Sequence, residues 1–172
     1  MRAPTLGIVI PCYNEEANLA ELINRCSELA VREKILFNIV NNGSTDGTSK
    51  FLSKLSPLAG INLITVPENK GYGYGIHVGL MHLKTDYVGW THADLQTDPN
   101  DLSRALNALQ EDPSTDFIKG VRKGRTFVDK FFTFGMTFFV LLIRKRFLWD
   151  INGQPTVMRK NLFDSWENIP DD

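Results

Sequence analysis

The chain contains 172 residues, which is enough for one domain with a sizeable core. Hydrophobic residues make up 42% and charged residues 23% of it, as is ordinary for a globular protein, and the formal net charge of −1 gives no reason to expect a nucleic-acid partner. The charge is unevenly distributed, because residues 119–146 contain eight Lys or Arg and a single acid and so carry +7 against −8 for the remainder. Such a local positive field attracts phosphate groups or an anionic membrane surface.

Cysteine use and apolar length indicate the compartment. Cys12 and Cys26 lack metal-ligand spacing and are expected to be free thiols in a reducing compartment. The N-terminus is too poor in apolar length for a signal peptide, which favours a cytoplasmic location. The longest apolar run, residues 131–143, is shorter than the roughly 18 residues that a membrane-spanning helix needs. We expect residues 1–172 to form a single domain, and the uncapped ending is typical of a truncated chain.

Strand and helix patterns alternate along the chain. An apolar, β-branched run at 5–11 predicts a strand that Pro11 ends, and apolar residues at helical spacing follow from Leu19 to Leu29. Turn residues close the later strands, and a proline in the first turn favours a helix that begins at Asp98. The expected strands are 5–11, 34–40, 61–66, 86–91 and 116–121, and the expected helices are 15–33, about 46–55, 71–83 and 98–110. This order predicts an α/β fold with a mostly parallel sheet and helices on both faces.

Polar clusters follow each of the five expected strands. They are "CYNE" at 12–15, "NNGSTD" at 41–46, "ENKG" at 68–71, "HADLQ" at 92–96 and "RKGR" at 122–125. In an open parallel sheet, ligands bind beyond the carboxyl ends of the strands. The five clusters therefore predict one ligand site at one edge of the sheet.

Two of these clusters allow two interpretations from the residues alone. "NNGSTDGT" (41–48) suits a strand-to-helix turn, and it equally suits base recognition, because an Asn amide offers an acceptor and a donor that match an edge of uracil or guanine. The glycine-rich stretch 69–79 fits neither a dinucleotide-binding nor a Walker pattern. Close packing of a helix on the sheet explains its glycines at least as well as ligand approach does.

The stretch "THADLQTDP" (91–99) predicts a metal site. His92, Asp94 and Gln96 alternate, and alternate side chains of extended backbone share a side. Carboxylate and amide oxygens suit Mg²⁺ or Mn²⁺, which proteins usually hold with one or two carboxylates together with substrate phosphates. Asp98 suits a helix cap because Pro99 follows it, whereas Asp94 has no such local task.

Four of these motifs, in order and correctly spaced, resemble a known family. "IVIPCYNEEANL", "IVNNGSTDGT", "NKGYGYGI" and "HADLQTDP" are similar to the family 2 glycosyltransferases of GT-A fold, most of all to their polyprenyl-phosphate branch, which includes dolichol-phosphate mannose synthase. The resemblance covers residues 5–125 well and thins beyond them. It implies a hexosyltransferase that moves a sugar with inversion from a nucleotide diphosphate sugar, with a divalent metal, Mg²⁺ or Mn²⁺, on the diphosphate.

The resemblance also implies roles for individual residues. Those matching nucleotide-sugar positions are Pro11, Tyr13 and Glu15 after the first strand, Val40 and Asn42 at the base, and His92 and Ala93. Asp94 and Gln96 match the metal ligands, so Asp94 is expected to be essential to catalysis. Arg122 matches an arginine that contacts the donor or acceptor phosphate, and Arg125 is expected to assist it. Residues 150–160 loosely resemble the segment that follows the family's acceptor helices.

Two departures from the family pattern make the expected donor pocket less acidic. Asn41 and Asn42 stand where the family usually has Asp-Asp, and His92 begins what is usually Asp-x-Asp. They leave open the nucleotide, the ribose contact and the preferred metal. We expect His92 to hydrogen-bond a ribose hydroxyl, and the alternative is that its imidazole ligates the metal.

The basic segment favours a phosphate acceptor. A sugar hydroxyl needs a general base, whereas a lipid phosphate is already anionic and needs positioning by arginine. We therefore expect transfer to a polyprenyl phosphate in cell-envelope synthesis, on the cytoplasmic face of a membrane. Residues 127–146 are expected to contact that membrane, although they suit a buried helix pair equally well. One alternative is transfer to a sugar hydroxyl of a cell-surface polysaccharide or lipopolysaccharide, with Asp150 as base. Another is a nucleotide-sugar-binding module without catalysis.

Overall fold

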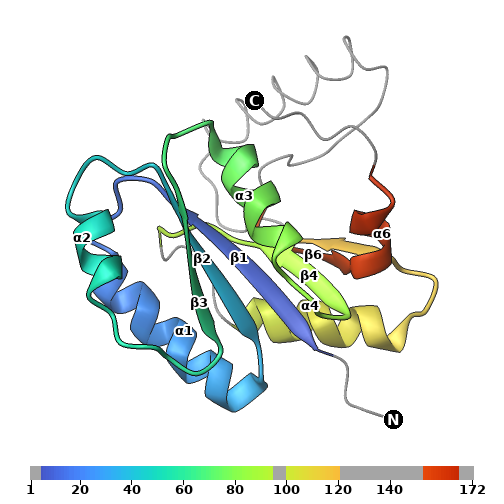
Figure 1. The fold of residues 1–172 in the computed structure, drawn as a ribbon. Helices are drawn as coiled ribbons and strands as arrows, with labels where there is room; N and C mark the ends of the chain where they lie inside the picture. The colour runs from blue at the N-terminus through green and yellow to red at the C-terminus, as the bar shows by residue number, and fades with distance from the viewer. Residues whose placement is uncertain (1–4, 95–99, 121–152, 167–172) are drawn as a thin grey trace, which may run out of the picture.

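A single sheet organises the chain in the computed structural model, which describes residues 5–94, 100–120 and 153–166. Its strands are β1 (Leu6–Cys12), β2 (Leu36–Asn42), β3 (Ile61–Val66), β4 (Tyr87–Trp90), β5 (Phe117–Lys119) and β6 (Thr156–Arg159). They lie in the order β3-β2-β1-β4-β6-β5 (Figure 1). The five strands predicted from the sequence are all present, and the mixed α/β fold is confirmed.

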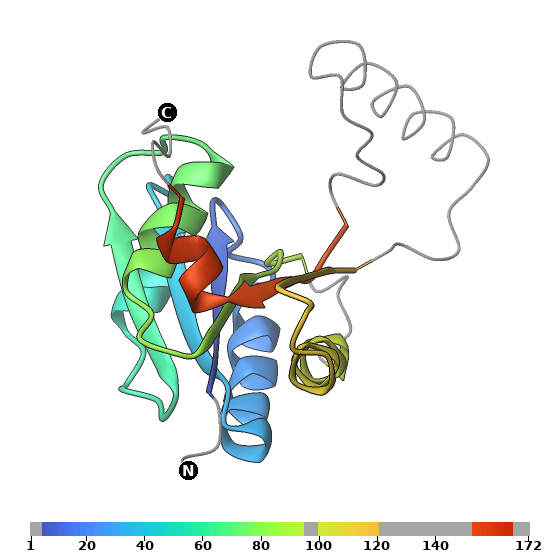
Figure 2. The ribbon, with the colours of Figure 1, turned by 90° about the vertical axis from the view of Figure 1, so that its right-hand side faces the viewer.

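Helices cover both faces of the sheet, as predicted. They are α1 (Leu19–Glu33), α2 (Thr48–Ser53), α3 (Tyr72–Met81), α4 (Asn100–Glu111) and α6 (Lys160–Asp164). Alternate residues of β1 point to opposite faces: Ile8 and Ile10 pack in the hydrophobic cluster under α1, α2 and α4, whereas Val9 packs in the one under α3 and α6. Figure 2 shows α1 and α4 on one side of the sheet and α3 and α6 on the other.

Strand β6 was not predicted, and it changes the direction of pairing. Strands β1 to β4 pair in parallel, but β6 lies between β4 and β5 and is antiparallel to both. Because β4 and β5 both oppose β6, they run in the same direction, and their carboxyl ends lie at the same edge. Its partner strands β4 and β5 lie far away in the sequence and run opposite to it, so the repeated β-α-β pattern did not indicate it.

Most predicted boundaries also differ from the observed ones by a few residues, and two of these differences have a local cause. Strand β1 continues through Pro11 to Cys12. Proline is tolerated there because β4 pairs with β1 only from Leu6 to Val9, so the missing N–H of Pro11 removes no hydrogen bond to β4. α1 begins at Leu19 rather than at residue 15, because the carbonyl of Glu15 accepts hydrogen bonds from the N–H groups of both Asn18 and Leu19 in a preceding turn.

Arg159 at the end of β6 fastens α4 to the sheet. Its guanidinium donates to the carbonyls of Leu109 (2.8 Å) and Thr115 (3.1 Å) and lies 3.3 Å from both the Tyr87 hydroxyl and the Asp116 carboxylate. The Leu109 carbonyl belongs to the last turn of α4, where backbone acceptors lack helical partners. Arg159 therefore caps that helix and joins it to β4, β5 and β6.

Helix α3 packs closely on the sheet through a glycine and a buried amide. Asn38 of β2 is fully buried, and its Nδ2 donates to the carbonyl of Gly79 at 2.8 Å while its Oδ1 accepts from Asn62 Nδ2 at 3.0 Å. A Cβ atom on Gly79 would overlap Val9 Cγ1 and lie 2.8 Å from Val9 Cγ2. Helix packing is thus the reason for this glycine, as the sequence suggested.

We predict that Gly79→Ala lowers the free energy of unfolding by about 1–3 kcal/mol, because the methyl group overpacks the contact with Val9. Gly73→Ala is the matched control: it lies in the same helix, no described atom lies within 4 Å of the place that its Cβ would take, and alanine favours the helix by up to about 1 kcal/mol. Urea unfolding of both variants measures the difference. Equal stability of the two would contradict the packing argument.

No helix within residues 5–94, 100–120 and 153–166 is both long enough and apolar enough to cross a membrane. The segment 127–146, predicted to face an acceptor or a membrane, lies outside these ranges, as do the basic residues that follow β5. Both predictions therefore stand as predictions.

Candidate functional site

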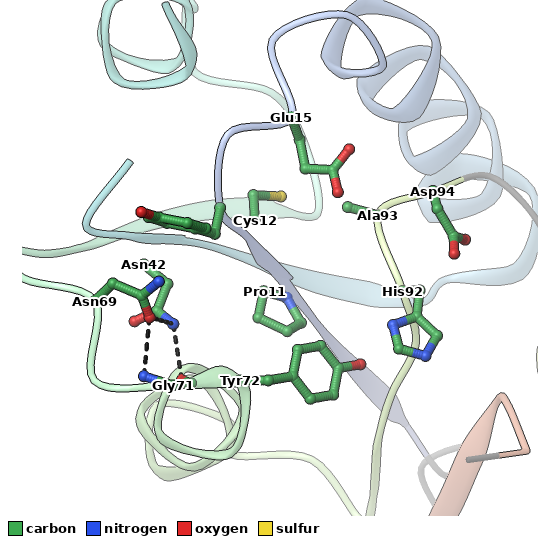
Figure 3. Close-up of a pocket in the computed structure, with 11 residues that line it drawn as sticks. Pro11, Cys12, Glu15, Asn42, Asn69, Gly71, Tyr72, His92, Ala93 and Asp94 are labelled. Atoms are coloured by element: carbon green, nitrogen blue, oxygen red, sulfur yellow. Dashed lines mark hydrogen bonds between the residues drawn. The ribbon is translucent and has the colours of Figure 1, made fainter. Parts of the chain in front are cut away.

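A cavity of about 310 Å³ lies beyond the carboxyl ends of β1, β2 and β4 (Figure 3). It is lined by Pro11, Cys12, Tyr13, Glu15, Asn42, Asn69, Gly71, Tyr72, His92, Ala93 and Asp94. Asn42, Asn69 and Gly71 gather on one side and His92 and Asp94 on the opposite side, and the Tyr72 ring extends from the first toward the second. The sheet edge that the polar clusters predicted therefore holds a cavity of ligand-binding size.

The structure brings most of the predicted site residues together here. Seven of them line the cavity, namely Pro11, Tyr13, Glu15, Asn42, His92, Ala93 and Asp94. Val40 is fully buried in the hydrophobic cluster beneath α3 and is not among the lining residues, so a contact between it and a base stays a prediction. Gln96, Arg122 and Arg125 lie outside the described residues, as does the predicted cap Asp98.

The loops after β1 and β2 are bound to each other by reciprocal hydrogen bonds. Asn14, whose φ is 57°, donates its N–H to Ser44 Oγ at 3.1 Å and accepts at Oδ1 from the N–H groups of Thr45 (2.8 Å) and Asp46 (3.3 Å). Asparagine tolerates this left-handed backbone better than most residues. These bonds fix the cavity wall that carries Tyr13 to the wall that carries Asn42.

Glu15 is oriented by the start of α1 and by the second loop. Its carboxylate accepts from Asn18 Nδ2 at 2.8 Å, and its N–H donates to Thr48 Oγ1 at 3.0 Å. A carboxylate held in this way presents its remaining acceptor capacity toward the cavity that it lines.

The side-chain amide of Asn42 joins the end of β2 to the segment before α3. Its Nδ2 donates to the Gly71 carbonyl at 2.8 Å and to Asn69 Oδ1 at 3.2 Å, which uses both of its hydrogens. The reverse amide orientation would place Oδ1 against these two acceptors, so the orientation is fixed. The sequence suggested that this amide offers a donor and an acceptor to a base, but in the structure only the acceptor is left.

That acceptor is buried and unpaired among the described residues. Asn42 is 2% exposed, and its Oδ1 has no hydrogen-bond partner. Leaving a buried acceptor unsatisfied costs about 1–3 kcal/mol. The oxygen is covered by its neighbours, so a ligand's donor reaches it only after a small side-chain movement, and binding would then relieve the penalty.

Asn41 has a different environment although it is the neighbouring amide. It is also 2% exposed, but its Nδ2 donates to Ser49 Oγ at 2.8 Å and its Oδ1 accepts from the Ser44 N–H at 3.2 Å. Both of its groups are therefore satisfied within the turn. Asn41 and Asn42, which stand where the family usually has Asp-Asp, thus have distinct structural roles.

A glycine allows the third loop to approach the second. Gly43 has a φ of +69°, and a Cβ atom there would lie 2.8 Å from Glu68 Cα and overlap the backbone of Asn69. Only glycine meets both conditions without strain. This close approach brings Asn69 and Gly71 within reach of Asn42.

Tyr72 is a cavity residue that the sequence did not reveal. It follows Gly71, whose φ is +94°, and begins α3, from which its ring stacks on His92 with 5.0 Å between ring centroids and 25° between planes. Burial raises the pKa of the phenol above its ordinary value, and the charge of Asp94 raises it further. An aromatic residue directly after a glycine at a strand-to-helix turn was the available signal.

Alternation after β4 directs His92 and Asp94 to the cavity, as predicted. Ala93 is 3% exposed and also packs in the core, whereas His92 and Asp94, which line the cavity with it, are half-buried. Among the residues described, no group of three or more His, Cys, Asp or Glu side chains is placed to hold a metal ion. A metal at Asp94 would therefore need ligands from a substrate or from outside these residues.

The two cysteines are buried free thiols, as predicted. Burial raises the pKa of each to about 12, and for Cys12 the nearby Glu15 adds to the effect. Cys12 thus lines the cavity as a neutral, weakly polar group at pH 7 and not as a thiolate nucleophile.

The family is decided by comparison with known proteins. The model of "Glycosyl transferase family 2" matches residues 7–165, which is most of the chain. The chain belongs to glycosyl transferase family 2. The resemblance seen in its four motifs is thereby confirmed.

Similar proteins are also found among curated sequences. The undecaprenyl-phosphate 4-deoxy-4-formamido-L-arabinose transferase of Sodalis glossinidius is 32% identical over 131 residues, which cover 73% of this chain and 39% of the relative. The protein of the same name from Salmonella choleraesuis is 32% identical over 126 residues, which cover 70% and 37%. The chain spans less than half the length of these curated relatives.

Solved structures share the fold of this family 2 chain. A mannosyltransferase from Pyrobaculum calidifontis in complex with GDP-Man and Mn²⁺ aligns with a TM-score of 0.72 at 23% identity, over 100% of this chain and 49% of that one. A glucosyl-3-phosphoglycerate synthase from Mycobacterium tuberculosis in complex with Mn²⁺, UDP and phosphoglyceric acid aligns with a TM-score of 0.71 at 19% identity. The alignment covers 95% of this chain and 58% of that one. The fold is the GT-A fold of glycosyltransferases.

We predict that Asn42→Asp, which restores the acidic residue usual in the family, lowers the free energy of unfolding by about 1–3 kcal/mol at pH 7. A carboxylate oxygen would replace the amide N–H groups that face the Gly71 carbonyl and Asn69 Oδ1. Urea unfolding measures the effect.

Asn41→Asp is the matched control, because the Ser49 hydroxyl can rotate to donate and the Ser44 N–H is already a donor. Its loss of stability should be the smaller of the two. An Asn42→Asp variant as stable as Asn41→Asp would show that the amide donors do not hold the third loop.

Proposed function

We propose that this chain is part of a glycosyltransferase that moves a sugar from a nucleotide diphosphate sugar to a polyprenyl phosphate. The observation that carries the proposal is the cavity in which Tyr13, Asn42 and Asp94, from the ends of three different strands, line one space. The names of the curated relatives support a polyprenyl-phosphate acceptor, and the GDP-Man bound to the mannosyltransferase of the same fold supports a nucleotide-sugar donor. Family membership supports the reaction class.

The donor would lie across the cavity with its base on the Asn42 side. Tyr13, 45% exposed at the rim, offers a ring against which a base can stack, and Asn42 Oδ1 offers an acceptor to a base N–H. Uracil and guanine both present such an N–H. The diphosphate would then extend toward Asp94 and His92 on the opposite side.

The Asp94 side of the cavity suits a divalent metal. Its carboxylate is a hard oxygen ligand of the kind that Mg²⁺ and Mn²⁺ prefer, and we assign it, with Gln96 beyond the described residues, as the protein's ligand set. When bound, such an ion would neutralise the charge that develops on the departing diphosphate. His92 is assigned to the ribose, since its ring already packs against Tyr72.

The reaction we propose is a single in-line displacement with inversion at the anomeric carbon. An oxygen of the lipid phosphate forms the new bond to that carbon as the bond to the nucleotide's β-phosphate oxygen breaks, and the electron pair leaves with the nucleoside diphosphate. A phosphate nucleophile is anionic at pH 7, so no residue has to remove a proton. Arg122 and Arg125 would position it, because an arginine fork binds two phosphate oxygens at once.

A transfer assay tests this proposal. The full chain is incubated with Mn²⁺, vesicles that contain undecaprenyl phosphate, and labelled UDP- and GDP-sugars in turn. We expect label in the lipid fraction with one donor, no transfer by Asp94→Asn, and at least about tenfold less by Arg122→Lys, since a point charge cannot make the bidentate contact.

Circular dichroism of both variants controls for folding, and Arg104→Lys, an exposed arginine of α4, controls for the Arg→Lys change itself. Transfer to a saccharide hydroxyl but not to the lipid would favour the polysaccharide alternative. Donor binding without transfer or hydrolysis would favour a binding module.

We further propose peripheral association of the segment 127–146 with the cytoplasmic face of a membrane. Its support is the +7 charge of residues 119–146 and the lipid acceptor in the relatives' names. In flotation assays, we expect the chain to float with anionic vesicles at low salt and to be released at about 1 M salt, where screening is nearly complete. Equal binding to neutral vesicles, or none to anionic ones, contradicts this proposal.

A further inference from the structure

Tyr72 and His92 form an aromatic pair that spans the cavity between two elements. Tyr72 comes from the first turn of α3 and His92 from the segment after β4, and both line the cavity beside Asp94. Their near-parallel rings, with centroids 5.0 Å apart, have the geometry of an offset stack. Tyr72 is 42% exposed as a whole residue, so part of it remains accessible to a ligand in the cavity that it lines.

The position of Tyr72 is fixed by the residues that precede it. The Gly71 N–H donates to Asn69 Oδ1 at 2.8 Å, and the Gly71 carbonyl accepts from Asn42 Nδ2 at the same distance. The turn therefore enters α3 in one conformation, with the Tyr72 ring directed across the cavity (Figure 3). A ring anchored at its backbone and stacked at its far end is pre-organised, which reduces the ordering that a ligand would otherwise require.

The phenol hydroxyl is a donor that suits an anionic partner. Among the described residues it makes no hydrogen bond, and it lies near enough to Asp94 for that carboxylate to raise its pKa, after the larger effect of burial. It is therefore neutral at pH 7 and carries a proton to donate. The ligand proposed for this side of the cavity, a diphosphate, offers only acceptor oxygens there.

On the basis of the proposed function, we propose that Tyr72 and His92 act as one donor-binding unit, in which the stack holds the Tyr72 O–H so that it donates to a diphosphate oxygen of the sugar nucleotide. Both members are donor-binding residues and take no part in bond breaking. His92, held by the stack, faces the ribose. His92 stands where the family usually has a carboxylate, so the diphosphate meets one negative charge fewer beside Asp94.

Isothermal titration of the full chain with UDP and with GDP, each with Mn²⁺ and again with EDTA, tests the hydroxyl. Tyr72→Phe keeps the ring and the stack but removes the O–H. We expect Tyr72→Phe to lower the affinity for the diphosphate that the wild type binds by at least about tenfold, both with Mn²⁺ and with EDTA. A loss of this size is that of a hydrogen bond to a charged group. Its affinity for the parent nucleoside, which lacks phosphate, should be unchanged.

Tyr74→Phe is the matched control. Tyr74 lies in the same helix, does not line the cavity, and its ring contacts Lys70, so its hydroxyl should not affect binding. Tyr72→Leu and His92→Leu, alone and combined, test the stack. If the two rings act as one unit, the affinity of the double variant for the diphosphate should be about equal to that of the single variant that binds less tightly. Thermal unfolding of each variant verifies that it is folded.

The outcomes separate the two proposals. Wild-type binding that Tyr72→Phe leaves unchanged overturns the hydroxyl contact and leaves the proposed function standing. Additive losses in the Leu variants overturn the paired role. No binding of either diphosphate by the folded wild type, with Mn²⁺ or without, overturns the proposed function and the donor-binding unit together.

Discussion

Because β1 pairs in parallel with β2 on one side and with β4 on the other, the chain arrives at the same edge of the sheet three times. Residues about thirty and eighty positions apart in sequence, such as Tyr13, Asn42 and Asp94, thereby meet around one cavity. Hydrophobic clusters on both faces hold this arrangement rigid. Every other feature of the site is a local adjustment at that edge: a turn, a cap or a stacked ring.

Asparagine side chains perform most of these local adjustments. Asn14 binds the first loop to the second, Asn41 closes the second turn on itself, and Asn42 fastens the second strand to the turn before α3. An amide can donate and accept at once, which a carboxylate cannot do. Asn41 and Asn42, where the family usually has acidic residues, therefore build the cavity wall through internal hydrogen bonds. Their neutral side chains also lower the negative charge that a diphosphate would meet.

Five strands, the helices on both faces and the sheet edge that holds the cavity could be predicted from the sequence. Burial of one face gives a helix or strand a periodic pattern of apolar residues, and turns require particular residue types. Local pattern did not indicate β6, because its partner strands lie far away in the sequence and it runs opposite to them. Nor did it indicate Tyr72, whose importance arises only when α3 brings it against His92. The internal use of both Asn42 hydrogens likewise depends on Gly43 admitting the third loop, a contact between segments.

The insertion of β6 between β4 and β5 has a consequence for how such a protein diversifies. Lys119, the last residue of β5, and Trp90, the last of β4, both pair with Thr156, the first of β6, and the Gly120 N–H donates to the Pro155 carbonyl at 2.8 Å. The sequence from 120 to 155 thus departs from and returns to adjacent points on the edge that bears the cavity. A stretch of another length or composition can be exchanged there without breaking one strand pairing. Evolution, or an engineer, can therefore exchange the segment between β5 and β6 while the sheet and its cavity stay unchanged.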